Sequence, residues 1–165
     1  MPSLSFFDAL LPLFKWCDNT WLGNVIRNSR IYFPIIETFH LFALTLLFGA
    51  VVILNLRLFG FILRRQPISQ LALDLAPWIR WNMVVILASG IMLFLSEAMK
   101  CYASEPFRFK MVFLFTALLF HFTIFRWVTR AGEGRMNPIW NWATGVLSLA
   151  LWFGVGLGGR AIGFL

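Results

Sequence analysis

The stretch "FRFKMVFLFTALLFHFTIFRW", residues 107–127, decides the fold class because it is long and apolar enough to cross a lipid bilayer. It nevertheless carries Lys110 near its start, His121 near its end and Arg126 just beyond. Ionisable side chains are expensive inside a bilayer, so those that occur there are candidate functional residues. The stretch raises two questions: how many such segments the chain has, and where their polar residues meet.

The whole chain has the composition of a membrane protein. Of its 165 residues, 60% are hydrophobic and only 13% are charged, whereas about a quarter of an ordinary soluble domain is charged. Its loops are too short for a separate soluble domain, so we expect a single all-α membrane domain over residues 1–165. The predicted architecture is an antiparallel four-helix bundle, and the predicted spans are 31–57, 77–97, 107–126 and 140–159.

The first thirty residues differ from the spans. The stretch "SLSFFDALLPLFKW", residues 3–16, alternates apolar and polar residues in a helical rhythm. Asp8, Lys15 and Asp18 argue against a secretory signal, which has a basic start and an uninterrupted apolar run. We expect residues 1–30 to form an interfacial segment with an amphipathic helix on the membrane surface, and a frayed tail is the alternative.

Four spans of alternating direction place both termini and the loop 98–106 on one side of the membrane, here called side one. The loops 58–76 and 127–139 then lie on side two. Tryptophan favours the membrane–water interface, and five tryptophans fall near the side-two boundary: Trp78, Trp81, Trp127, Trp140 and Trp142.

Basic residues leave the orientation almost undecided. The fourteen lysines and arginines divide equally between the two sides, and only the adjacent pair Arg64–Arg65 favours a cytoplasmic side two, with periplasmic termini. The net charge of +7 is expected to face phospholipid headgroups. Nucleic acid is not an expected partner, because no basic run exceeds two residues.

Two small patterns concern packing and redox state. Ala150, Gly154 and Gly158 recur every four residues, a spacing that lets helices approach closely in lipid. Cys17 and Cys101 both belong to side one, where a disulfide becomes chemically feasible if that side is periplasmic. We favour two unrelated free thiols.

The polar residues inside the spans form two groups. The first lies towards side one, where we expect its members to converge: Glu37, His40, Glu97, Lys110 and Arg160. Glu37 and His40 are three residues apart and share a helix face. The alternative for Glu97, Lys110 and Arg160 is internal ion pairing and snorkelling. The second group lies towards side two and is interpreted mainly as interfacial anchors: Asn55, Arg57, Arg80, Asn82 and Arg126.

His40 and His121 are the only histidines, and histidine in a helical bundle is a common axial ligand of haem b. His40 lies ten residues past Arg30 and His121 eleven past Lys110, so both are about 15–16 Å deep when counted from side one. One haem could then use both. Counted from side two the depths differ, because Arg57 is seventeen residues past His40 but Arg126 only five past His121.

If the depths differ, His40 is the preferred single ligand. Glu37 would then orient its second ring nitrogen, and Lys110 or an open position would complete the iron coordination. In either arrangement, two pairs of cations are candidates for the haem propionates. These are Arg57 with Arg126 towards side two, and Lys110 with Arg160 towards side one.

Two segments resemble the membrane protoporphyrinogen oxidase family of four-helix bacterial proteins: "HLFALTLLFGAVVILNLRLFGF", residues 40–61, and "KMVFLFTALLFH", residues 110–121. The resemblance places His40, Arg57, Lys110 and His121 at family positions, and it implies haem and oxidation of a porphyrin precursor. The chain departs from that family in having Leu56 where the family has proline, and in a His40–Arg57 spacing that looks one residue longer.

With these departures, the stretches "ETFHLFALTLLFGAVVILNLRLFG", residues 37–60, and "FRFKM", residues 107–111, look closer to an uncharacterised family of small bacterial inner-membrane proteins. That family has four helices and is loosely similar to copper-resistance D-type membrane proteins. The resemblance implies a multi-pass protein of the bacterial inner membrane, and it implies no activity.

Three functional hypotheses follow. The first is a haem b protein that transfers electrons or oxidises a porphyrin, with a membrane redox partner and His40 and His121 as metal ligands. The second is a cofactor-free subunit or assembly factor, and homo-oligomers are compatible with either. The third is a copper or proton conduit through Glu37, His40 and Glu97, although copper sites usually gather more methionine and cysteine ligands.

Overall fold

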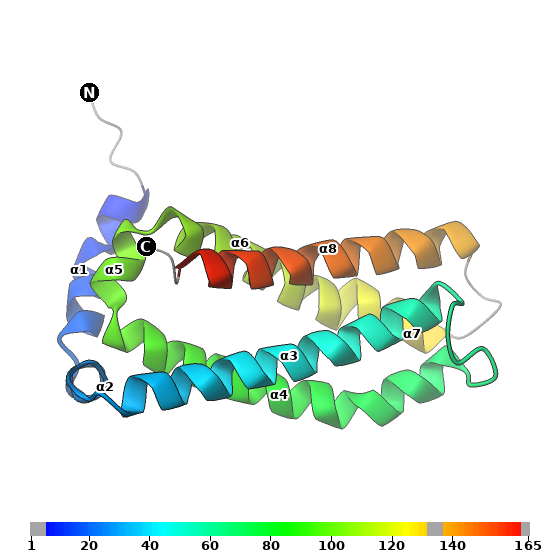
Figure 1. Ribbon diagram of the computed structural model, residues 1–165. Helices are drawn as coiled ribbons and strands as arrows, with labels where there is room; N and C mark the ends of the chain where they lie inside the picture. Colours follow the sequence, from blue (N-terminus) through cyan, green and yellow to red (C-terminus); the bar gives the residue numbers. More distant parts are fainter. Residues whose placement is uncertain (1–5, 132–136, 163–165) are drawn as a thin grey trace.

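The computed structural model describes residues 6–131 and 137–162, and these residues form helices joined by short connections (Figure 1). In chain order the helices are α1 (Phe6–Asp18), α2 (Trp21–Asn28), α3 (Tyr32–Leu58), α4 (Ile68–Ser96), α5 (Ala98–Ala103), α6 (Glu105–Phe120), the π-helix η1 (His121–Phe125), α7 (Arg126–Ala131) and α8 (Pro138–Ile162).

Four segments are long and apolar enough to cross a membrane: α3, α4, the continuous segment α6–η1–α7, and α8. Successive segments run in opposite directions, so α1 and the end of α8 lie at the same end of the bundle (Figure 1). This end corresponds to side one. The prediction of an all-α bundle with four candidate spans is confirmed.

Short polar side chains define where the spans begin. The Ser29 hydroxyl accepts a hydrogen bond from the backbone N–H of Tyr32 at 3.2 Å, and the Ser104 hydroxyl accepts one from Phe107 at 3.3 Å. Both hydrogen bonds satisfy backbone donors that have no partner in the first turn of a helix, and Ser104 is the N-cap residue of α6. The loop predicted at 98–106 therefore contains the short helix α5 as well as the cap of α6.

The second span begins earlier than predicted. Helix α4 starts at Ile68, directly after Pro67, and it continues through Pro77, where the predicted span began. A proline removes one backbone hydrogen bond, but neighbouring helices can hold the helix on both sides of it. The added turns are more polar, and Gln70 donates a hydrogen bond to Asp74 one turn later at 3.0 Å.

Close helix approaches hold the bundle together. Helix α3 packs against α4 and α8, and α6 packs against α8. A Cβ atom at Gly158 would lie 2.9 Å from Cβ of Lys110 in α6, and one at Gly154 would overlap the Phe113 ring. The packing role predicted for these two glycines is confirmed, whereas Ala150 is exposed and does not continue the row.

A buried polar contact also joins two spans. Asn55 in α3 has no exposed surface, and its Nδ2 donates to the hydroxyl of Ser148 in α8 at 3.2 Å. Hydrogen bonds between helices contribute to association in lipid, where apolar contacts alone discriminate little. Asn55 is thus a packing residue of the bundle interior, not an interfacial anchor.

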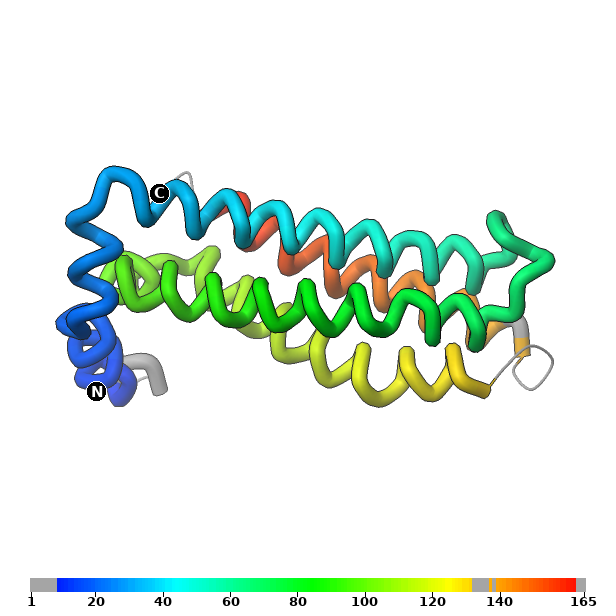
Figure 2. The backbone as a smooth tube through the Cα atoms, turned by 90° about the horizontal axis from the view of Figure 1, so that it is seen from below, coloured from blue at the N-terminus to red at the C-terminus, as the bar shows by residue number. Residues whose placement is uncertain are grey.

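The N-terminal segment crosses the side-one end of the bundle as two helices, α1 and α2 (Figure 2). Phe14 and Cys17 on the inner face of α1 pack with Ala98 and Cys101 of α5, while Trp16 and Trp21 are exposed. The predicted amphipathic helix is therefore present, although Asn19 and Thr20 lie between α1 and α2 and divide it into two helices. Its placement on a membrane surface stays a prediction.

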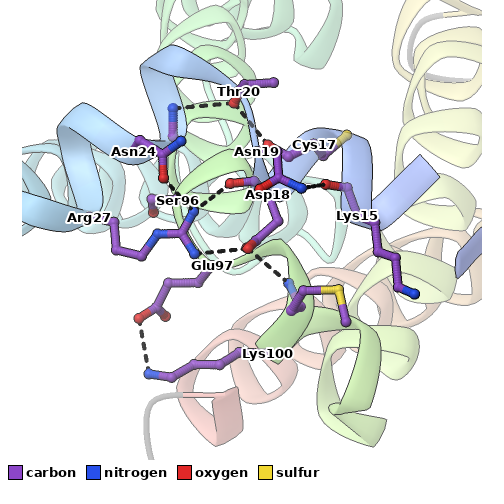
Figure 3. Close-up of polar contacts among 12 residues, drawn as sticks. Lys15, Cys17, Asp18, Asn19, Thr20, Asn24, Arg27, Ser96, Glu97 and Lys100 are labelled. Carbon is purple, nitrogen blue, oxygen red and sulfur yellow. Dashed lines mark hydrogen bonds and ion pairs between the residues drawn. The ribbon is translucent and has the colours of Figure 1, made fainter. Parts of the chain in front are cut away.

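Asp18 joins α1, α2 and α5 (Figure 3). Its Oδ2 accepts from Nη1 of Arg27 at 2.9 Å, and its Oδ1 accepts from the backbone N–H of Met99 at 3.4 Å. We call this set of contacts the clasp. The hydrogen bond from Arg27 lowers the pKa of Asp18 below its usual value of 3.8.

The first prediction concerns the glycine row. Gly158→Leu should lower the free energy of unfolding by about 1–3 kcal/mol, because the new side chain overlaps the backbone of α6 at Lys110. Thermal unfolding in detergent measures the effect. Gly156→Leu is the matched control, since no atom lies within 4 Å of a Cβ there. Equal destabilisation by both variants would contradict the close approach at Gly158.

The second prediction concerns the clasp. Asp18→Asn removes the charge that pairs with Arg27, so backbone hydrogen exchange should accelerate in α1 and α2. Because the pKa of Asp18 is lowered on folding, its contribution is present above the usual pKa and is lost as the pH falls through the lowered value. Arg30→Gln, an exposed change nearby, is the control. Equal acceleration in that control would refute a specific clasp.

Candidate functional site

A cavity of about 590 Å³ lies in the side-one half of the bundle, and we call it cavity A. Its walls come from α1, α3, α4, α5, α6 and α8, and they are almost wholly apolar. The polar groups in this lining include His40, Lys110, Arg108, Tyr102 and Cys101. Two members of the predicted side-one group, His40 and Lys110, therefore share one cavity.

The imidazole of His40 is held by a chain of hydrogen bonds. Its Nδ1 lies 2.9 Å from Oγ of Ser89 in α4, and the Ser89 hydroxyl is also within hydrogen-bond distance of the Val85 and Ile86 carbonyl oxygens. A hydroxyl has one hydrogen, and when Ser89 donates it to the Val85 carbonyl, Oγ accepts from Nδ1–H of His40. In this arrangement the neutral ring has its proton on Nδ1 and a lone pair on Nε2.

Gly90 makes room for this histidine. A Cβ atom at position 90 would lie 3.3 Å from Cε1 of His40, closer than ordinary van der Waals contact. The ring therefore lies directly against the backbone of α4. His40 is 7% exposed, and its position is fixed by the packing of α3 on α4 rather than by neighbours on its own helix.

Lys110 supplies a cation to the same cavity. Its stem packs against Gly158, and Nζ lies near Gly159, so α8 leaves space for the side chain. Among the described residues no carboxylate forms an ion pair with Lys110. Arg108, two residues before Lys110, donates from Nη2 to the backbone carbonyl of Tyr102 at 3.1 Å and also lines the cavity.

Cys101 lines cavity A as a protonated thiol. Burial, followed by the nearby carboxylate of Glu97, raises the pKa of Cys101 to about 11. A thiolate ligand or nucleophile needs the opposite shift. Cys17 lies in the same apolar cluster, and both thiols are free.

Cavity A opens on the lipid-facing surface between α4 and α6. Ile91 of α4 and Val112 and Phe115 of α6 line it, and each is at least 60% exposed. Closer to side two, α4 contacts α7, the last part of the third span. This contact closes the bundle on the side-two side of the opening. An apolar ligand can therefore reach His40 from the side of the bundle.

His121 lies elsewhere. It lines a second cavity of about 240 Å³, cavity B, together with Ile79 and Arg80 of α4 and Arg126. Because His40 contacts Ser89 and His121 lies near Ile79, the histidines are offset by roughly 15 Å along α4. The structure does not bring them together at one iron.

The equal depths counted from side one are therefore wrong. That count took Lys110 as a marker of the headgroup level, but Lys110 packs against Gly158 inside the bundle. Counting residues from the side-two charges Arg57 and Arg126, which gives the two histidines different depths, agrees better with the structure. His121 also begins the π-helix η1, which widens the third span locally, and such segments are frequent at functional sites.

The other predicted site residues lie apart from cavity A. Glu37 is exposed on the outer face of α3, so it does not orient His40, and Ser89 occupies that role. Glu97 pairs with Lys100 at 2.9 Å. Arg57 is buried and donates from Nε to the Gln66 carbonyl at 2.8 Å, which fastens the loop after α3, and Arg160 is exposed near the end of α8.

Within the described residues, no group of three or more His, Cys, Asp or Glu side chains is placed to hold a metal ion. The acidic partners of the predicted copper or proton conduit, Glu37 and Glu97, therefore do not assemble with His40. Sequence reasoning missed Ser89 and Gly90, which are neighbours on α4. No local pattern marks them, because their role depends on contact with α3.

The fold and the site define a multi-pass membrane protein with a laterally open, histidine-containing cavity. The family of unknown function DUF6644 matches residues 13–165, so the chain belongs to that family. This confirms the resemblance to an uncharacterised family. No curated protein and no solved structure gave a significant match to the chain. The likeness to the protoporphyrinogen oxidase and copper-resistance D-type families stays a prediction.

Proposed function

We propose that the protein binds haem b in cavity A, with His40 as an axial ligand, and transfers electrons within the membrane. The observation that carries the proposal is the hydrogen-bond chain from His40 through Ser89 to α4. It presents the Nε2 lone pair, and haem-ligating histidines are commonly held in this way through their other nitrogen.

The cavity itself supports a large, mostly apolar cofactor. Its volume of about 590 Å³ lies within the range of about 300–1,000 Å³ typical of cofactor and ligand sites. Lys110 and Arg108 lie in its lining, and cations of this kind pair with propionate carboxylates. Arg57, which had been considered for that role, is bonded to Gln66 instead.

The separation of the histidines favours one histidine ligand rather than two. A second ligand would come from Met111 or from Lys110, both of which line cavity A, and an open position is the third arrangement. If Lys110 were the ligand, it would be neutral, and Arg108 would be left to pair with the propionates. Haem, when bound, would supply one-electron chemistry. The chain's own part would be to fix the tautomer of His40, exclude water and neutralise the propionates.

Three finer parts of the proposal have other grounds. Oxidation of a porphyrin precursor and a location in the bacterial inner membrane rest on the resemblances. Periplasmic termini rest on the Arg64–Arg65 pair, which favours a cytoplasmic side two. The copper or proton conduit is less favoured, because Glu37 and Glu97 lie away from His40. The competing hypothesis is a cofactor-free subunit or assembly factor, and the visible absorption spectrum of the purified protein distinguishes it from a haem protein.

The third prediction is spectroscopic. Protein purified after expression with ample haem supply should show haem b bands on reduction, and His40→Ala should abolish them because the axial nitrogen is lost. His121→Ala is the matched control: it removes the other buried histidine of the spans, and it should leave the bands in place. A colourless, folded wild-type protein would overturn the proposal in favour of the cofactor-free subunit.

The fourth prediction concerns Ser89. Ser89→Ala removes the acceptor of the Nδ1 hydrogen bond, so haem affinity should fall by about 10–100-fold while the bundle stays folded. Ser89→Thr keeps a hydroxyl and should restore most of the affinity. Haem titration of the apoprotein measures both variants. An unchanged affinity in Ser89→Ala would show that the chain through α4 does not prepare His40 for a ligand.

A further inference from the structure

Cavity B lies between α4 and the segment η1–α7, in the side-two half of the bundle. Its volume is about 240 Å³, and its lining is more polar than that of cavity A. Four of its residues carry basic or imidazole groups: Arg80, His121, Arg126 and Arg130. Cavities A and B share no lining residue, so cavity B is a separate site from that of the proposed haem.

His121 is the buried member of this set. It is 9% exposed and stacks on Phe125 with ring centroids 5.3 Å apart. Its Nδ1 is shielded from solvent and has no hydrogen-bond partner among the described residues. Because Nδ1 is shielded, a ligand in the cavity cannot reach it. Nε2 is therefore the ring nitrogen through which His121, a lining residue of cavity B, can bind a ligand.

The three arginines give cavity B a positive rim. Among residues 6–131 and 137–162, no carboxylate forms an ion pair with Arg80, Arg126 or Arg130. Asp74, the acidic residue of this part of α4, accepts hydrogen bonds from Gln66 and Gln70 and does not line the cavity. Within this part of the chain, the rim is thus not neutralised.

Tryptophans mark the depth of the rim. Trp78 and Trp81 flank Arg80 in sequence, Trp127 follows Arg126, and all three are more than 60% exposed. Exposed tryptophan favours the headgroup level of a bilayer. Leu73 and Phe122 also line cavity B and are about half exposed, so an apolar surface adjoins the arginines.

We propose that cavity B binds the headgroup phosphate of an anionic phospholipid. Arg80, Arg126 and Arg130 contact the phosphate oxygens through charge-assisted hydrogen bonds, and His121 donates a hydrogen bond from Nε2. Leu73 and Phe122 contact the first part of an acyl chain. A soluble phosphate shares the headgroup chemistry, but the depth of the rim and the adjoining apolar surface favour the lipid.

The test is a lipid titration of delipidated protein in detergent, followed by native mass spectrometry. Phosphatidylglycerol should bind more tightly than phosphatidylcholine with the same acyl chains. Arg80→Gln and Arg126→Gln should each weaken phosphatidylglycerol binding about fivefold, since one basic residue near the surface contributes about 1 kcal/mol. The double variant should lose about 25-fold if the two contacts add.

Arg65→Gln is the matched control, because it removes one exposed positive charge on side two away from cavity B. It should leave the affinity unchanged. If Arg65→Gln weakens binding as much as Arg126→Gln, the attraction is a general effect of charge and the site is refuted. The thermal unfolding of each variant is measured alongside, so that loss of binding is not mistaken for loss of fold.

Two further arms separate the lipid from a soluble anion and test His121. Glycerol 3-phosphate should not displace bound phosphatidylglycerol, and displacement at comparable concentration would overturn the lipid as occupant. His121→Phe keeps the ring stacked on Phe125 but removes the hydrogen bond, so lipid affinity should fall while the bundle stays folded. Unchanged affinity in His121→Phe would contradict its part in the site.

Discussion

The rest of the structure depends on the requirement that polar groups in a hydrocarbon environment find partners within the protein. The spans meet this requirement for the backbone by being helical. Three polar side chains find partners through contacts between segments: Asn55 with Ser148, His40 with Ser89, and Arg57 with the Gln66 carbonyl. For Asn55 this holds for Nδ2, because its buried Oδ1 has no partner within the described residues. Lys110 and His121 have no comparable contact within the described residues, and each lines a cavity.

This requirement also explains which parts of the fold could be predicted. Length and apolar character are sufficient to find the four spans, and alternation of direction then places the two ends together. The rotation of each span about its axis was not predictable. Helix α3 is apolar around most of its circumference, so its sequence does not mark the face that meets α4. The contact of His40 with Ser89, 49 residues away in sequence, could therefore not be predicted.

The candidate site shows the same division. His40 and Lys110 were predicted to converge, and they do line one cavity. Glu37 was grouped with His40 because of its i, i+3 spacing, but such spacing covers a wide arc, and here one side chain is exposed while the other is buried. The depth of Lys110 was misjudged because glycines on α8, far away in sequence, let a charged side chain lie inside the bundle.

The π-helix at His121 has no signal in the sequence either. A π turn adds a residue to one helical turn, and whether it forms depends on how the flanking residues pack. Here it places Phe125 against His121 and brings α7 to α4. The third span therefore packs on α8 in its first half and on α4 in its last, which separates cavity A from cavity B.

Because cavity A opens between α4 and α6, its occupancy depends on the concentration of the ligand in the bilayer. A solute that arrives through this opening is drawn from a hydrocarbon layer about 30 Å thick, so its mole fraction among lipids governs loading, not its aqueous concentration. Acyl chains are then competitors for the same space. A sparingly soluble molecule that partitions into the bilayer can therefore be abundant at this opening although little of it is dissolved in the water.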